Sequence, residues 1–211
     1  MHVTMNTTKA MDRQLVKKSK KLSRLLRHSA SDIELEIDEA GWVAVDDVLR
    51  TLNMSRADLE MVVRENNKSR LQLEGDRVRA CQGHSLDNWA VTREGLEASW
   101  DAYAGDASVW HGTSVDAVAS IAREGILAVG RTHVHLAPAM SSKVGKRASV
   151  HVMLEISPAR VRAAGVGLFV APNGVVLARE IPASCVIGLH AMTTRARERE
   201  AELSRLFTGI E

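Results

Sequence analysis

The chain has 211 residues, of which 45% are hydrophobic and 26% charged, and its formal net charge is +2. This composition is typical of a folded globular protein and excludes disordered and collagen-like chains. No stretch approaches about 18 consecutive apolar residues and no signal peptide is recognisable, so we expect neither a membrane span nor secretion. Cys81 and Cys185 are too few for a disulfide framework, which favours a reducing, cytoplasmic location.

The first predicted helix is strongly basic. From Leu15 to Leu26 the leucines fall largely on one helical stripe, with lysines on the other face. Such a basic face can dock a phosphate backbone, and a merely solvated face explains it equally well. The helix ends on Arg27 and His28, two adjacent cationic groups that packing does not require. A bound anion would account for them.

The next segments predict two short helices and a hairpin. Residues 41–52 suggest an extended piece followed by a helix that Asp46 caps. Residues 55–66 begin with Ser55 and carry Asp58 three positions later, which is close to a capping box. The alternating stretches RLQL and RVRA flank a turn at residues 74–76 and predict a β-hairpin. Helices followed by a hairpin favour a winged-helix-like lobe, which is common in nucleic-acid-binding proteins.

The rest of the chain predicts a second lobe of mixed structure. Residues 85–106 lack a strand pattern, so we expect them to connect two lobes with a boundary near Gly105. An apolar strand then ends on His-Gly-Thr, and the helix that follows is closed by Gly125. Five short extended segments follow, which together predict an α+β fold with a curved sheet. The expected units are residues 1–104, residues 105–192 and a charged, solvated tail helix at 193–211.

The sequence lacks a Walker loop, a G-x-G-x-x-G fingerprint and a C-x-x-C pair. His133 and His135 share one face of a predicted strand, and with His111 they could form a zinc site. Each histidine is more simply explained as a hydrogen-bonded structural residue. The arginines suggest a different kind of site, because the planar fork of donors of a guanidinium matches a phosphate. If the fold gathers the arginines at positions 27, 79 and 131, they would surround a dianionic phosphomonoester.

Five ordered blocks carry a resemblance to a known family. They are KKLSRLLRH, GWVAVDDVL, RVRACQGHS, WHGTS and RTHVHLA, between about Lys20 and Ala178. Together they resemble the NAD-dependent RNA 2'-phosphotransferases, the family that removes the splice-junction 2'-phosphate from ligated transfer RNA. The resemblance implies an N-terminal winged-helix-like lobe that binds RNA and a C-terminal lobe of the ADP-ribosyltransferase type that binds NAD.

The resemblance also assigns residues. The catalytic set that it implies is Arg27, His28, Arg79 and Arg131. The NAD-binding set is His111, Gly112, Thr113, His133 and His135. The residues expected near the RNA or its phosphate are Lys68, Arg70, Gln82, Gly83, His84 and Ser85. Leu71 and Val176 stand where the family has aromatic residues, which puts substrate contacts in doubt more than the chemistry.

The implied reaction has two steps and uses no metal. The RNA 2'-phosphate attacks the nicotinamide ribose of NAD, and as an anion it needs no general base. The 2''-hydroxyl of the ADP-ribose then attacks the phosphorus and releases 2'-hydroxyl RNA and ADP-ribose 1'',2''-cyclic phosphate. The expected partners of a monomeric protein are NAD and transfer RNA-like RNA. Two alternatives stay open: a one-step ADP-ribosyltransferase acting on nucleic-acid ends or protein, and a non-catalytic RNA-binding sensor of NAD or ADP-ribose.

Overall fold

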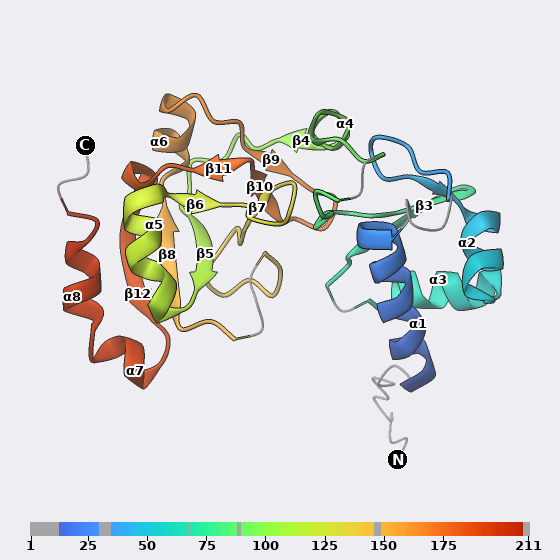
Figure 1. Cartoon of the computed structure of the whole chain (residues 1–211), viewed down its shortest axis with the longest axis horizontal. Helices are drawn as coiled ribbons and strands as arrows, with labels where there is room; N and C mark the ends of the chain where they lie inside the picture. Colours follow the sequence, from blue (N-terminus) through green and yellow to red (C-terminus); the bar gives the residue numbers. More distant parts are fainter. Residues whose placement is uncertain (1–12, 30–34, 67, 88–89, 146–148, 209–211) are drawn as a thin grey trace, which may run out of the picture.

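The computed structural model describes residues 13–29, 35–66, 68–87, 90–145 and 149–208. Its helices and strands form an elongated molecule with a helical lobe at one end and most of the strands, with further helices, toward the other (Figure 1). The described residues combine helices with strands that pair antiparallel, so the expected α+β class is confirmed. Among the described helices, none has the length and apolar character needed to cross a membrane.

The N-terminal lobe consists of helices around a small sheet. Its elements are α1 (Arg13–Arg24), the π-helical turn η1 (Leu25–Ser29), β1 (Val43–Ala44), α2 (Val45–Leu52), α3 (Arg56–Arg64), β2 (Leu71–Glu74) and β3 (Arg77–Ala80). The three strands are antiparallel in the order β1-β3-β2. The predicted hairpin is therefore confirmed, and the first strand closes its other edge.

Two predicted helix starts in this lobe had different outcomes. The capping box is confirmed, because the hydroxyl of Ser55 accepts from the backbone N–H of Asp58 at 3.1 Å. The cap at Asp46 was wrong: α2 begins at Val45, and its N-cap residue Ala44 makes no side-chain hydrogen bond. Asp46 instead lies in the first turn, where its charge favours the helix dipole.

The C-terminal lobe is built from short strands and helices. Its helices are α4 (Arg93–Ala98), η3 (Val115–Ala117), α5 (Val118–Glu124), α6 (Pro158–Ala163), η4 (Ala183–Cys185), α7 (Thr194–Arg197) and α8 (Glu200–Arg205). Its strands are β4 (Asp101–Ala102), β5 (Val109–Thr113), β6 (Ile126–Leu127), β7 (Val134–Leu136), β8 (Val152–Ile156), β9 (Phe169–Val170), β10 (Val176–Ala178), β11 (Glu180–Ile181) and β12 (Val186–Ala191). They form sheets ordered β12-β8-β5, β4-β9-β10-β7 and β11-β6. A bridge between Trp110 and Ala137 joins the two larger sheets.

Helix α4 lies in the segment expected to be a plain connection. The hydroxyl of Thr92 caps it by accepting from the N–H of Gly95 at 2.9 Å. A Cβ atom at Gly95 would come within 2.6 Å of the carbonyl oxygen of Glu39, so only glycine allows this close approach. The helix is therefore placed by its contact with the N-terminal lobe.

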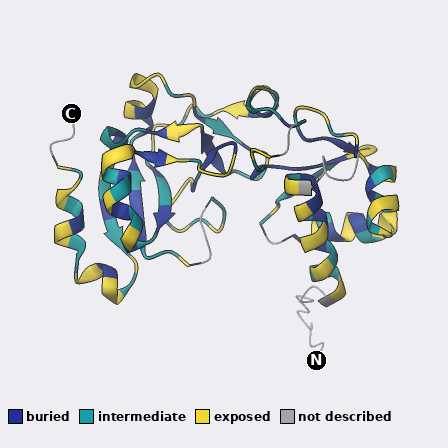
Figure 2. Ribbon diagram, viewed as in Figure 1, coloured by how far each residue is buried: buried dark blue, intermediate teal, exposed yellow. Residues whose placement is uncertain are grey.

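The tail differs from the solvated helix that its charges predicted. It forms α7 and α8, and two small apolar positions are buried against the core, Ala196 at 0% and Leu203 at 1% exposure. Each of the two short helices therefore buries one apolar residue, while most of its charged residues are exposed. Figure 2 shows that most of α8 is coloured as exposed or intermediate.

Three apolar clusters hold the molecule together. One fills the N-terminal lobe around the fully buried Leu22, Leu26 and Leu59, and one fills the C-terminal lobe. The third joins the lobes and consists of Cys81, Val91, Leu96, Trp100, Ala171, Val175 and Leu177. Burying side chains of this size contributes about 1.5–3 kcal/mol each. The third cluster therefore makes the contact between the lobes a packed one.

Candidate active site

A cavity of about 640 Å³ is lined by residues of both lobes. Its volume lies within the range of roughly 300–1,000 Å³ that is usual for small-molecule sites. The wall is rich in basic groups, because five basic side chains from three segments line it: Arg27, His28, Lys68, Arg70 and Arg131. This convergence makes the cavity a site for an anion.

Arg27 and His28 reach the cavity from the turn η1. Leu25 and Leu26 of the same turn are buried in the N-terminal core, which leaves the next two side chains directed away from it. The wider π-helical turn changes the helical register at its end, a feature often found at functional sites. The carbonyl of Arg27 would otherwise be an unpaired helix-end group, and Ser85 satisfies it through its N–H at 3.1 Å and its hydroxyl at 3.3 Å.

The Arg27 guanidinium is largely desolvated. Burial, together with the positive charges of Arg70 and Arg131, lowers the pKa of Arg27 to about 10, so it stays charged at neutral pH. Its Nε and Nη2 atoms are buried without a hydrogen-bond partner in the described structure. Leaving charged donors unpaired in this way is costly, and a bound oxyanion would satisfy them. The electrostatics thus point to the same ligand class as the lining.

Arg131 is brought beside Arg27 by a junction of the two lobes. Ser85 and Arg131 form an antiparallel bridge, flanked by hydrogen bonds from Leu86 N to Gly130 O at 3.3 Å and from Thr132 N to His84 O at 3.1 Å. Because Ser85 also holds the end of η1, one residue links the two arginine-bearing segments. Backbone bonds rather than flexible side chains therefore set their spacing.

The three histidines of the C-terminal lobe are each held by another group. The Nδ1–H of His111 donates to the carbonyl of His135 at 3.2 Å, and the Nε2–H of His135 donates to the side-chain oxygen of Gln82 at 2.8 Å. The Nε2–H of His133 donates to Glu97 at 3.0 Å. Burial, helped by the charges of Arg131 and Arg27, lowers the pKa of His135 to about 3, so this ring is neutral. The described residues contain no group of three His, Cys, Asp or Glu side chains arranged for a metal ion, which leaves the zinc alternative without support.

Most of the residues that the sequence singled out line the cavity. They are Arg27, His28, Lys68, Arg70, Gln82, Ser85, His111, Gly112, Arg131, His133 and His135. Four do not line it: Arg79, Gly83, His84 and Thr113. The structure therefore brings together three arginines, with Arg70 in the place expected for Arg79.

Arg79 is buried, with an exposure of only 3%. Its Nε donates to Gln72 at 2.8 Å, and its Nη1 donates to the hydroxyl of Ser99 at 2.7 Å and to the carbonyl of Ala40 at 3.3 Å. Its guanidinium also lies over the Trp42 ring. In this structure the guanidinium is turned toward these partners and Arg79 is not among the residues that line the cavity, so its expected part in phosphate binding stays a prediction.

The other three residues shape the site from behind. Gly83 has a φ of +91°, and a Cβ there would come within 3.4 Å of the guanidinium carbon of Arg27. His84 is completely buried, and burial lowers its pKa to about 3. Thr113 is buried at the end of β5. These residues set the position of Arg27 and of the strands without facing the cavity.

Sequence reasoning missed an apolar rim at residues 127–130. Leu127 and Val129 line the cavity and are 49% and 85% exposed. Val129 has a φ of +54°, which is strained for a β-branched residue and is typically found at functional sites. Asn173 was also not assigned a role; its side chain donates to the carbonyl of Lys68 at 3.2 Å. No sequence pattern distinguishes Val129 from a core valine.

The chain is similar to proteins named probable RNA 2'-phosphotransferases. It is 36% identical over 187 residues to one from Streptomyces griseus, covering 81% of this chain and 95% of that protein. It is 35% identical over 171 residues to one from Rhizobium johnstonii, covering 78% and 89%, and 37% identical over 174 residues to one from Pseudomonas syringae pv. tomato, covering 78% and 89%. The family described as RNA 2'-phosphotransferase, Tpt1 / KptA matches residues 13–180. With its arginine-lined cavity inside that range, the chain belongs to the RNA 2'-phosphotransferase family.

Proposed function

We propose that this protein removes an internal 2'-phosphate from RNA by transferring it to NAD, and that the products are 2'-hydroxyl RNA, nicotinamide and ADP-ribose 1'',2''-cyclic phosphate. The observation that carries the proposal is the convergence of Arg27, Arg70 and Arg131 on one cavity between the lobes. In this proposal the N-terminal lobe is a winged-helix-like RNA-binding lobe and the C-terminal lobe is of the ADP-ribosyltransferase type. A monomer acts in the cytoplasm on transfer RNA-like RNA.

The three arginines bind the 2'-phosphate. A phosphomonoester carries about −1.5 to −2 charges at neutral pH, which more than one guanidinium is needed to balance in a desolvated site. As the phosphorus is attacked, charge grows on its oxygens, and donors already in place stabilise that charge. Arg131 serves this second step, and Arg27 and Arg70 hold the phosphate throughout. His28, at the mouth of the site, is the side chain best suited to carry a proton.

The residues present fit NAD as the co-substrate. When bound, it supplies an electrophilic ribose carbon that carries nicotinamide as leaving group. His111 is fixed at the wall by its bond to the carbonyl of His135, in an orientation suited to a ribose hydroxyl. Gly112 allows close packing there, since a Cβ would come within 2.7 Å of Val150. The exposed apolar rim at Leu127 and Val129 offers a surface for a base.

The test is incubation of the protein with NAD and an oligoribonucleotide that carries one labelled internal 2'-phosphate. We expect label to leave the RNA as ADP-ribose cyclic phosphate, only when NAD is present and equally in a chelator. Arg27→Ala, Arg70→Ala and Arg131→Ala should each lower the rate by about 10²–10³, with ADP-ribosylated RNA accumulating in Arg131→Ala. RNA that keeps its phosphate would refute the proposal. Accumulation of ADP-ribosylated RNA by the wild type would favour the one-step enzyme, and binding without turnover would favour the sensor.

A further inference from the structure

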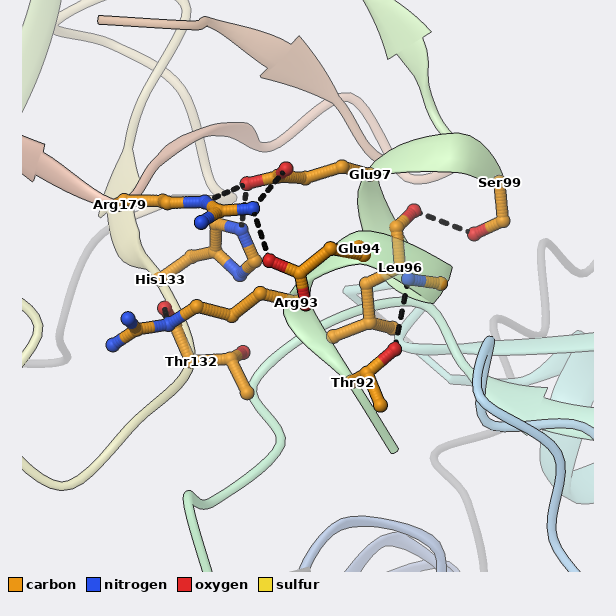
Figure 3. A network of polar contacts seen from close by, with 10 residues as sticks. Thr92, Arg93, Glu94, Leu96, Glu97, Ser99, Thr132, His133 and Arg179 are labelled. Atoms are coloured by element: carbon orange, nitrogen blue, oxygen red, sulfur yellow. Dashed lines mark hydrogen bonds and ion pairs between the residues drawn. The ribbon is translucent and has the colours of Figure 1, made fainter. Parts of the chain in front are cut away.

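A partly exposed ion-pair network ties helix α4 to the segment that leads into strand β7 at the cavity (Figure 3). Arg179, which follows β10, donates from Nε and Nη2 to the two carboxylate oxygens of Glu97, both at 2.7 Å. Its Nη2 also donates to Glu94 at 2.7 Å. The oxygen of Glu97 that receives the Arg179 Nε also accepts from the Nε2–H of His133. Glu97 therefore connects the arginine that follows β10 with the histidine that precedes β7, the strand paired with β10.

The two glutamate side chains differ in how far they are buried. The side chain of His133 is 1% exposed and that of Glu97 is 15% exposed, whereas that of Glu94 is 70% exposed. The hydrogen bond from Arg179 lowers the pKa of Glu97, and burial lowers the pKa of His133. Glu97 is thus an ionised acceptor that keeps the proton of a neutral imidazole on Nε2. Glu94 contributes only to the outer end of the network.

Two further contacts fasten α4 to the same strand. The Nε of Arg93 donates to the carbonyl of Thr132 at 3.1 Å. The ring of Trp100 meets that of His133 edge-on, with centroids 5.0 Å apart. Residues 132 and 133 therefore both contact α4 or the turn that follows it. The residues on either side of them, Arg131 and His135, line the cavity.

We propose that Glu97 and Arg179 are positioning residues for phosphate transfer. They hold the segment 131–135, which leads into β7, in the position that brings Arg131 and His135 to the substrates. This inference rests on the proposed function. Neither residue lines the cavity, so each acts through His133. A displacement of reacting groups by about 1 Å costs on the order of 100-fold in rate. Loss of the contacts of Glu97 or Arg179 would allow such a displacement of the segment that carries Arg131.

A positioning role differs from a role in stability. The side chain of Arg179 is 44% exposed, and ion pairs of this kind contribute little to folding. Removing Arg179 should therefore leave the melting temperature nearly unchanged while the turnover number falls. Since the site still holds its arginines, the KM for RNA should change little.

The experiment compares Arg179→Ala, Glu97→Ala and Glu97→Gln with the matched control Glu94→Gln, which removes a negative charge beside the same arginine but changes no contact of His133. Turnover number, KM, melting temperature and the ¹⁵N resonances of the His133 ring are measured for each. We expect the two alanine variants to lose about tenfold or more in turnover number with KM within about threefold. Glu97→Gln should be intermediate, because its amide oxygen still accepts from His133. Glu94→Gln should match the wild type, and only the Glu97 variants should disturb the Nε2 proton of His133.

The inference is overturned if Glu94→Gln loses as much turnover as Glu97→Ala, or if the loss follows the unfolded fraction alone. An unchanged His133 resonance in Glu97→Ala would also overturn it. A wild-type protein that turns over no RNA would refute the proposed function instead. The resonance of His133 would then still decide whether Glu97 holds that ring.

Discussion

The guanidinium carbon of Arg79 lies 4.5 Å from the centroid of the Trp42 ring, and the same guanidinium donates to Ser99 beside α4. A stack of a desolvated cation on tryptophan contributes up to about 2 kcal/mol. Arg79 thus joins the hairpin of the N-terminal lobe to the helix that braces the cavity strand. These contacts fix the position of Arg79 relative to both segments.

Arg79→Ala should therefore lower stability more than catalysis. Removing the side chain leaves the partly buried Gln72 and Ser99 without this donor, so we expect a loss of about 2–4 kcal/mol in the free energy of unfolding. Urea unfolding and the specific activity of the folded protein measure the two effects separately. Arg79→Lys, which keeps the charge but not the fork of donors, should lie between. A 100-fold loss of activity with unchanged stability would return Arg79 to the catalytic set.

His28 should take up a proton when the phosphate binds. Burial and then the charges of Arg27, Arg131 and Arg24 lower its pKa in the free protein, so the ring is neutral at about pH 7.5. A dianion placed beside it raises that pKa. Calorimetric titration with a 2'-phosphorylated oligonucleotide, in two buffers of different ionisation enthalpy, measures the uptake. We expect it to vanish in His28→Asn and with RNA that lacks the phosphate; equal uptake in the variant would exclude His28.

His84 should make the protein sensitive to mild acid. Its pKa is about 3 in the folded state and about 6.5 in an unfolded chain, so the unfolded state binds the proton first. The stability it provides is present above about pH 6.5 and is lost as the pH falls toward 3, by about 1.4 kcal/mol per pH unit. Between pH 7 and pH 5, the free energy of unfolding should therefore fall less per pH unit in His84→Leu than in the wild type. An identical slope in the variant would contradict this assignment.

The exposed cations of α1 should govern the salt dependence of RNA binding. Lys17, Lys20, Lys21 and Arg24 are exposed at helical spacing on the face that ends at His28. The triple change Lys17→Gln, Lys20→Gln, Lys21→Gln should reduce the slope of log affinity against log salt by about 2, at about 0.7 per phosphate contact. The matched control is Lys18→Gln, because Lys18 is already paired with Asp58 at 2.6 Å. A slope that does not change in the triple variant would place the RNA elsewhere.

Features set by local chemistry were predictable from the sequence. The capping box at Ser55, the hairpin turn at Gly75 and the helix end at Gly125 depend on residues within a few positions, and all three are present. Helix α4 was not predictable, because it has only six residues and is placed by the contact of Gly95 with Glu39. The short tail helices were misjudged for a related reason, since a single buried leucine does not mark a packed face in a charged sequence.

The site was partly predictable. Arg27, His28 and Arg131 stood out as cations beside apolar segments, and they do meet at the cavity. The sequence could not show whether Arg70, directly before the hairpin, or Arg79, in its second strand, faces the cavity. Which one faces the cavity depends on how the hairpin packs against Trp42 and Ser99, a contact between segments far apart in the chain.

The apolar cluster that joins the lobes has a consequence for how the enzyme meets its substrates. Trp100 and Leu96 are covered by Val175 and Leu177, more than 70 positions later in the chain. Neither half of the polypeptide can keep these side chains from water alone, so the whole molecule should melt in one cooperative transition. The free-energy cost of bringing three like-charged guanidinium groups together is then part of the folding equilibrium. An RNA phosphate therefore binds to a site that is already formed.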